Sequence, residues 1–200
     1  MDRPASEIPA IQASRAYTPA AVEVIESKQS DYARLSTTIA SESGLRAHEL
    51  HTLQRLNGPA DRQPSERRAW SDERFSGREH WARYTVAGKG GLVREIRMTP
   101  ETAARLEAMK VEPRTVFDRS IAYKDARYNV MGGKSFSNTF SKTSMEQLGH
   151  SYGAHGLRHT YAQDRMKELC SAGKSWDDAK LIVSQELGHF RPSITDIYLR

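Results

Sequence analysis

The sequence predicts an α+β fold that is mainly helical, with helices packed around a small antiparallel β-sheet. Three observations lead to this prediction. The chain has 200 residues, which is enough for one well-buried domain. Signals for the start of a helix recur along the chain. In each, a capping residue is followed by proline or by apolar residues at helical spacing. One short stretch has the alternation and the glycine-rich turn of a β-hairpin.

The N-terminal part of the chain is expected to be helical. A threonine followed by proline begins a helix over residues 18–28, because threonine caps a helix and proline fits its first turn. A second helix covers residues 31–43 and stops at Gly44, since glycine readily adopts the left-handed conformation that ends many helices. Residues 45–55 are predicted to form a third, short helix.

The middle of the chain differs in character. Residues 57–80 are charged, contain proline and glycine and lack a sustained period, which indicates an exposed insertion. The segments 84–87 and 92–96 flank a Gly-Lys-Gly-Gly turn and form the predicted hairpin. A helix over 99–110 begins with another threonine-proline pair, and a loop is predicted for 111–133. Further helices are predicted at 135–148, 156–172, 176–187 and, as a short helix, 192–198.

Composition limits the classes of function. Lys and Arg total 30 against 25 for Asp and Glu, which gives a formal net charge of +5. This mild excess raises the expectation of a polyanionic partner only slightly. Cys170 is the single cysteine, so an intrachain disulfide is excluded and nothing indicates secretion. The sequence has no apolar stretch typical of a signal peptide or membrane span, so a cytoplasmic location without a membrane partner is expected.

Two arginines stand in the same local pattern. Arg46 and Arg158 each follow a Gly-Leu pair at the start of a predicted helix. A guanidinium binds two phosphate oxygens at once, and the backbone N–H groups at a helix start also favour an anion. Taken alone, either arginine is more often a solvated surface charge. The repeated Gly-Leu-Arg favours a pair of phosphate clamps without deciding between the two interpretations.

The other candidate residues are a tyrosine, two histidines and a lysine. Tyr198 follows His189 by nine residues, and His155 lies three residues before Arg158, so that the latter two share a helix face. A tyrosine phenol titrates at about pH 10 and is a poor nucleophile unless cations surround it. Lys89, in the hairpin turn, could donate a proton to a leaving alkoxide. A surface or core histidine and a polar turn lysine are the plainer alternatives.

Four segments of the sequence contain these residues in order. They are SGLRAHEL (43–50), VAGKGGLVREIRMTP (86–100), HGLRHTYA (155–162) and ELGHFRPSITDIYLR (186–200). They resemble the motifs of the catalytic domain of the tyrosine recombinases, the phage-integrase family, and the resemblance covers residues 15–200. It implies an integrase-like catalytic fold and a site-specific recombinase or integrase that cleaves and rejoins DNA strands.

The resemblance implies a role for each candidate residue. Tyr198 attacks the scissile phosphate, forms a 3′-phosphotyrosyl intermediate and releases a 5′-hydroxyl. Arg46 and Arg158 hold the non-bridging oxygens, and Lys89 protonates the leaving oxygen.

The remaining implied roles are supporting ones. His155 assists proton transfer, His189 hydrogen-bonds the phosphate and Glu49 orients the surroundings of the first arginine. The covalent intermediate conserves the energy of the broken bond, so neither ATP nor a metal or other cofactor is expected. The implied partners are double-stranded DNA and further copies of the chain, as a homotetramer on DNA.

The resemblance also implies an N-terminal core-binding domain, which we expect to be absent. Residues 1–16 are predicted to be an arm or linker remnant and residues 17–200 the catalytic domain. The alternative function is that of a catalytically inactive or truncated DNA-binding relative that acts as a regulator. A metal hydrolase is disfavoured, because His155 and His159 lack a third ligand nearby in the sequence.

Overall fold

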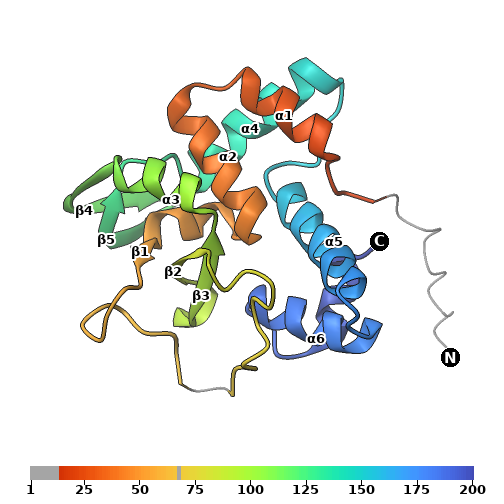
Figure 1. Ribbon diagram of the computed structural model, residues 1–200. Coiled ribbons are helices and arrows are strands. Elements are labelled where there is room, and N and C mark those ends of the chain that lie inside the picture. The colour runs from red at the N-terminus through yellow and green to blue at the C-terminus, as the bar shows by residue number, and fades with distance from the viewer. Residues whose placement is uncertain (1–13, 67–68) are drawn as a thin grey trace, which may run out of the picture.

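The computed structural model describes residues 14–66 and 69–200. Within these ranges, helices surround a small antiparallel sheet, so the predicted α+β class is confirmed (Figure 1). Most of the predicted N-terminal arm, residues 1–16, lies outside the described residues. Every helix in the described ranges is too short or too polar to cross a lipid bilayer.

The first two helices lie where their capping signals predict them. They are α1 (Pro19–Ser27) and α2 (Asp31–Ser43). The Thr18 hydroxyl accepts a backbone N–H of the first turn of α1 at 3.2 Å. Gly44 ends α2 with a φ of +61°. A Cβ atom at this position would come within 2.6 Å of the Tyr161 ring, so glycine allows α2 to end close to the helix that carries Tyr161.

The predicted hairpin is confirmed and belongs to a three-stranded antiparallel sheet. Its strands lie in chain order: β1 (Gln54–Arg55), β2 (Ala82–Ala87) and β3 (Val93–Met98). A short 3₁₀-helix, η2 (Lys89–Gly91), forms the turn between β2 and β3. The predicted helix over 45–55 is shorter than expected. It is the 3₁₀-helix η1 (Ala47–Thr52), and β1 follows it.

The predicted loop over residues 111–133 is wrong. Strands β4 (Lys110–Asp118) and β5 (Ile121–Tyr128) form a second, two-stranded antiparallel sheet there, so the expectation of a single sheet is also wrong. Most residues of this hairpin are exposed, so its sequence has little of the apolar alternation that indicates a strand. Its two-residue turn consists of Arg119 and Ser120, with φ of +48° and +65°, in place of the usual Asn-Gly.

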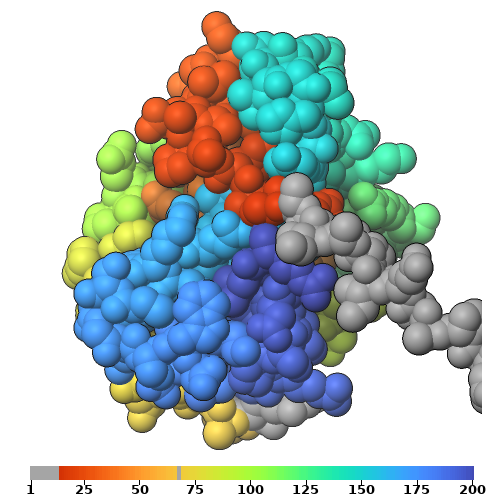
Figure 2. Space-filling view, turned by 90° about the vertical axis from the view of Figure 1, so that its right-hand side faces the viewer, coloured from red at the N-terminus to blue at the C-terminus, as the bar shows by residue number. Residues whose placement is uncertain are grey.

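The remaining helices follow the prediction closely. They are α3 (Pro100–Glu107), α4 (Gly133–Leu148), α5 (Gly156–Ser171), α6 (Trp176–Glu186) and the 3₁₀-helix η3 (Pro192–Tyr198). Helices α1, α2 and α4 share one apolar core with the three-stranded sheet, and α5, α6 and η3 enclose a second. On the face shown in Figure 2, the last residues of the chain, in dark blue, lie beside α5 and α6.

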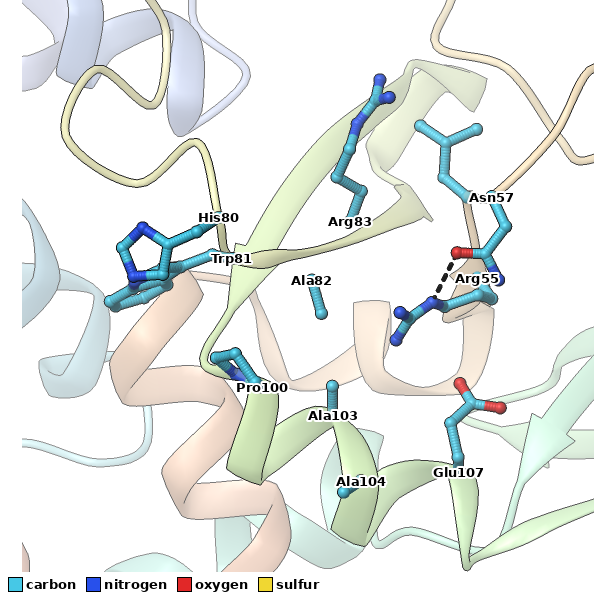
Figure 3. Close-up of a pocket in the computed structure, with 11 residues that line it drawn as sticks. Arg55, Asn57, His80, Trp81, Ala82, Arg83, Pro100, Ala103, Ala104 and Glu107 are labelled. Carbon is cyan, nitrogen blue, oxygen red and sulfur yellow. Dashed lines mark hydrogen bonds between the residues drawn. The ribbon is translucent and has the colours of Figure 1, made fainter.

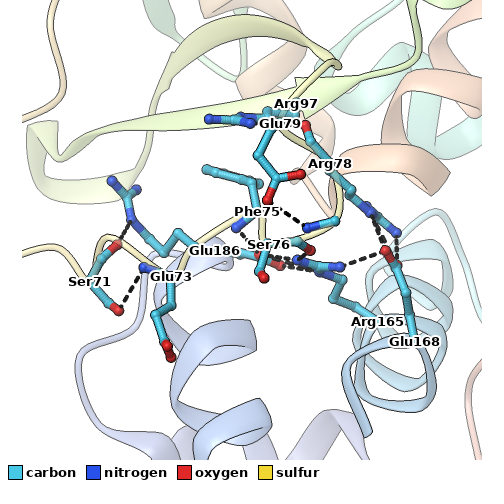
Figure 4. A network of polar contacts seen from close by, with 12 residues as sticks. Ser71, Glu73, Phe75, Ser76, Arg78, Glu79, Arg97, Arg165, Glu168 and Glu186 are labelled. Carbon is cyan, nitrogen blue, oxygen red and sulfur yellow. Dashed lines mark hydrogen bonds and ion pairs between the residues drawn. The ribbon is translucent and has the colours of Figure 1, made fainter. Parts of the chain in front are cut away.

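The segment 57–80 is anchored to α5 and α6, so the prediction of an exposed insertion is wrong around Phe75; residues 67–68 lie outside the described residues. Phe75 is buried, and its N–H donates to the Glu186 carboxylate at 2.8 Å. Arg165 pairs with the same carboxylate at 3.1 Å and donates to a backbone carbonyl of the segment (Figure 4). These buried charges need backbone partners, and the segment supplies them.

Candidate active site

Arg158 lies in the first turn of α5 and is fully buried. Its Nη1 and Nη2 atoms donate to the carbonyl oxygens of Gly44 and Leu187, each at 2.5 Å. These two bonds join the end of α2 to the end of α6. Burial, together with the nearby charges of Arg46 and Arg94, lowers the pKa of Arg158 to about 10, so it stays a cation at neutral pH.

Arg46 immediately precedes η1, and its side chain is 30% exposed. The buried Glu49 carboxylate accepts the backbone N–H of Arg46 at 2.7 Å and its Nη1 at 3.3 Å. The first of these bonds caps η1, and the second orients the guanidinium. The predicted proximity of Glu49 to the first arginine is therefore present in the structure.

His189 lies between the two guanidinium groups. Its Nε2 is 3.2 Å from Nη2 of Arg46 and 3.3 Å from Nη2 of Arg158. Burial and these two arginines lower the pKa of His189 to about 3, so the ring is neutral at physiological pH. A guanidinium only donates hydrogen bonds, so Nε2 is the acceptor and the proton lies on Nδ1.

Tyr198 is the last residue of η3 and is buried against the same cluster. Its ring centroid is 5.3 Å from Cζ of Arg158, 5.6 Å from the ring of His155 and 5.7 Å from the ring of His189, on which it stacks. Its backbone carbonyl accepts a hydrogen bond from Gln163 on α5 at 3.1 Å. The structure thus brings the tyrosine, both arginines and both predicted histidines into one cluster.

Two histidines at the start of α5 contact Tyr198. His155 is exposed at the helix start, and partial burial beside Arg158 lowers its pKa to about 4. His159 follows one turn later, with its ring 4.9 Å from that of Tyr198 and edge-on to it. It is buried, which also lowers its pKa to about 4. The sequence offers His159 only as a candidate metal ligand, although its spacing from His155 places both rings on the same helix face.

Lys89 is not brought into this cluster. It is exposed at the tip of the β2–β3 hairpin, and no hydrogen bond or ion pair to it is present within residues 14–66 and 69–200. It lines a pocket of about 540 Å³, and Arg46 and His155 line a neighbouring one of about 220 Å³. Both pockets are also lined by His48, Asp118 and Arg119.

Arg94 is a residue of this region that the sequence did not reveal. It lies on β3, is 2% exposed and pairs with Glu49 at 2.9 Å. An arginine in a half-buried strand is usually placed on the solvent side, so the sequence pattern carried no signal of its burial.

A separate pocket of about 560 Å³ lies between α3 and β2 (Figure 3). Arg55, Trp81, Arg83 and Glu107 are among its lining residues, and none of the predicted site residues lines it. Within the part of the chain that the structure describes, no three His, Cys, Asp or Glu side chains are grouped so that they could hold a metal ion.

The fold is similar to that of solved recombinases and an integrase. XerA recombinase is 16% identical, with 98% of this chain and 61% of that chain covered and a TM-score of 0.60. XerH site-specific recombinase bound to a palindromic difH substrate is 14% identical, with 93% and 49% covered and a TM-score of 0.56. The Tn1549 transposon integrase in complex with a circular intermediate DNA is 15% identical, with 96% and 63% covered and a TM-score of 0.52.

These similarities show a shared fold. This chain spans 49% to 63% of the length of those three chains. No protein-family model and no curated protein sequence matches it.

Proposed function

We propose that this chain cleaves and rejoins strands of duplex DNA as a site-specific recombinase or integrase, with Tyr198 as the nucleophile. The observation that supports this most is the cluster in which Arg158, His155 and His189 lie 5.3 to 5.7 Å from the Tyr198 ring. A nucleophile, fixed cations and a neutral imidazole are the groups that phosphodiester transfer requires. The fold shared with recombinases is consistent with this use of the cluster.

In the proposed reaction, the two arginines bind the scissile phosphate. The Nη2 atoms of Arg46 and Arg158 both lie within 3.3 Å of His189 Nε2, so a phosphate oxygen bound beside the ring, between the two guanidinium groups, would receive donors from both. Their positive charge stabilises the extra negative charge of the transition state. The phosphate anion would also favour protonation of His189, which would turn Nε2 into a third donor.

The covalent step transfers the phosphoryl group to tyrosine. The Tyr198 phenol oxygen attacks phosphorus, the bond from phosphorus to the 5′-oxygen breaks, and the phenol proton passes to neutral His155. Lys89 gives a proton to the leaving 5′-oxygen, which requires the exposed hairpin tip to approach the DNA. In rejoining, a 5′-hydroxyl attacks the phosphotyrosine and the bond from phosphorus to the phenol breaks. Neutral Lys89 takes the proton of the hydroxyl, and protonated His155 returns one to the phenol oxygen. This route uses neither ATP nor a metal.

The proposed partner is double-stranded DNA. The similar XerH and Tn1549 structures contain DNA, and the net charge of +5 is favourable for binding a polyanion. Exchange of strands needs two duplexes, so we include a homotetramer on DNA in the proposal. The cytoplasm is the proposed place of action.

A covalent-capture experiment tests the proposal. Duplexes of randomised sequence, each nicked a few nucleotides from a random position, are incubated with the protein, because loss of the short fragment prevents rejoining. We expect a protein–DNA adduct that survives denaturant and is absent from Tyr198→Phe. Sequencing of the captured strands then gives the preferred site.

The control is Tyr152→Phe, another tyrosine of the same domain that lies outside the cluster. An adduct that persists in Tyr198→Phe would contradict the assigned nucleophile. Binding of the duplexes without any adduct would favour the inactive, regulatory alternative.

A further inference from the structure

Arg94 is a buried cation with a single charged partner among the residues that the structure describes. Its side chain is 2% exposed on β3, and its Nη2 donates to Glu49 Oε2 at 2.9 Å. Its Nε and Nη1 atoms are buried and have no hydrogen-bond partner among the described residues. A buried guanidinium that leaves two nitrogen atoms unpaired costs free energy, so its presence at this position calls for a role beyond packing.

The carboxylate that binds Arg94 also binds Arg46. Glu49 Oε2 accepts both the Arg94 Nη2 at 2.9 Å and the backbone N–H of Arg46 at 2.7 Å, while Oε1 accepts the Arg46 Nη1 at 3.3 Å. Glu49 is fully buried, so its ionised form depends on the cations that touch it. Arg94 is thus linked through Glu49 to the Arg46 guanidinium, which is proposed to bind phosphate.

The other end of the Arg94 side chain contacts the turn before His189. A Cβ atom at Gly188 would come within 2.9 Å of Arg94 Cδ, and Gly188 has a φ of +79°. The stem of Arg94 therefore lies directly against the turn that places His189 between Arg46 and Arg158. Arg94 therefore contacts Glu49, which binds Arg46, and also the turn at Gly188, which precedes His189. Its own guanidinium does not contact the Tyr198 ring.

We propose that Arg94 is a positioning residue: its Nη2 holds the Glu49 carboxylate that binds Arg46, and its stem packs against the turn at Gly188 that precedes His189. This inference rests on the proposed strand-transfer function. It adds a residue that touches neither DNA nor Tyr198, and it predicts that Arg94 acts on the reaction through Glu49.

The test uses Arg94→Met, Glu49→Gln and the double variant, assayed for the rate of Tyr198 adduct formation against pH. The charged and titratable groups around Glu49 are Arg46, Arg94, Arg158, His48 and His189. Burial raises the pKa of Glu49, but these arginines, Arg94 foremost, hold it below its usual value. Without Arg94 the carboxyl protonates at a higher pH.

We expect Arg94→Met to slow adduct formation by about 10- to 100-fold, as for other groups that orient a functional residue indirectly. The defect should grow as the pH falls, because Glu49 becomes neutral and releases Arg46. The double variant should not show this further loss of rate at low pH, since it has no carboxyl at position 49 to titrate. Arg94→Lys, which retains the charge, should keep the wild-type pH profile.

The loss of Tm in Arg94→Met should depend on pH in the opposite sense to its loss of rate. The wild type keeps Glu49 ionised to lower pH than Arg94→Met, so it gains more stability as the pH rises. The gap in Tm between the two is therefore widest at neutral pH and narrows on acidification. If Arg94 had a purely structural role, its rate defect and its loss of Tm would change with pH in the same direction.

The matched control is Arg83→Met, which removes another arginine–carboxylate pair of the same sheet, Arg83 with Glu95 at 3.0 Å. It should leave the rate unchanged. An Arg94→Met variant with the wild-type pH profile, or with a defect that Glu49→Gln does not alter, would overturn the inference. Absence of any adduct in the wild type would overturn the proposed function, and the Tm comparison would still test the link between Arg94 and Glu49.

Discussion

The histidines around Tyr198 show how the surroundings of a residue set its charge. Burial beside arginines lowers the pKa of His189 to about 3 and those of His155 and His159 to about 4. All three rings are therefore neutral in the DNA-free protein. A neutral His155 can accept a proton from Tyr198, whereas a protonated one could not.

This electrostatic environment predicts how stability depends on pH. In the unfolded chain these histidines bind protons below about pH 6.5, while in the folded chain they resist protonation until about pH 3 to 4. The unfolded state binds more protons in that window, so stability falls as the pH drops through it. His189→Gln, whose amide oxygen can still accept from the arginines, should reduce this loss by about 1 kcal/mol.

Thermal unfolding between pH 4 and 7 checks the prediction. His150→Gln, at an exposed position outside the cluster, is the control and should keep the wild-type slope. An unchanged slope in His189→Gln would mean that its pKa is not depressed.

Among the elements, those with a local chemical signal were predicted and those without one were missed. Threonine-proline caps located α1 and α3, and the glycine-rich turn located the β2–β3 hairpin. The β4–β5 hairpin has an exposed surface and a turn of Arg119 and Ser120, so neither its period nor its turn residues indicated strands. Its pairing is decided by contacts with the rest of the fold, which local sequence does not record.

The turn of this hairpin gives a prediction about stability. Arg119 and Ser120 both have positive φ, a region that costs non-glycine residues roughly 1 kcal/mol each. Arg119→Asn with Ser120→Gly supplies the residues that such a turn prefers. Asparagine keeps part of that cost and glycine loses more backbone entropy on folding, so the net gain is about 1 kcal/mol. We expect this double variant to raise Tm by about 2–4 °C, measured by thermal unfolding.

The control for the turn is Arg114→Asn with Thr115→Gly, two positions within β4 where glycine should destabilise the strand. If the Arg119 and Ser120 variant melts below the wild type, the turn does not have the left-handed conformation described above.

At the scale of the whole molecule, the candidate site is assembled from segments that are remote in sequence. Arg46 precedes η1, Arg158 starts α5, His189 follows α6 and Tyr198 ends η3. Their residue types and order could be recognised from the sequence, but the assigned roles remain predictions. Burial of Arg94 could not be foreseen, because it follows from how the sheet meets the turn after α6.

Residues 71–79 are held to α5 and α6 by one buried network, which should therefore contribute strongly to the stability of the domain. Glu186 is 1% exposed and binds Arg165 and the Phe75 N–H (Figure 4). It also accepts a hydrogen bond from the Tyr161 hydroxyl. Glu186→Gln leaves Arg165, which is itself fully buried, without its full counter-charge. Breaking a buried pair in this way costs about 3–5 kcal/mol. We expect a lower Tm and faster proteolysis within 57–80.

The control is Glu73→Gln, which removes the exposed pair with Lys174 from the same segment and should cost at most about 1 kcal/mol. If the two variants prove equally stable, Glu186 is not what holds the segment, and its other contacts with α5 and α6, such as Arg78 with Glu168 and Ser71 with Gln185, hold it.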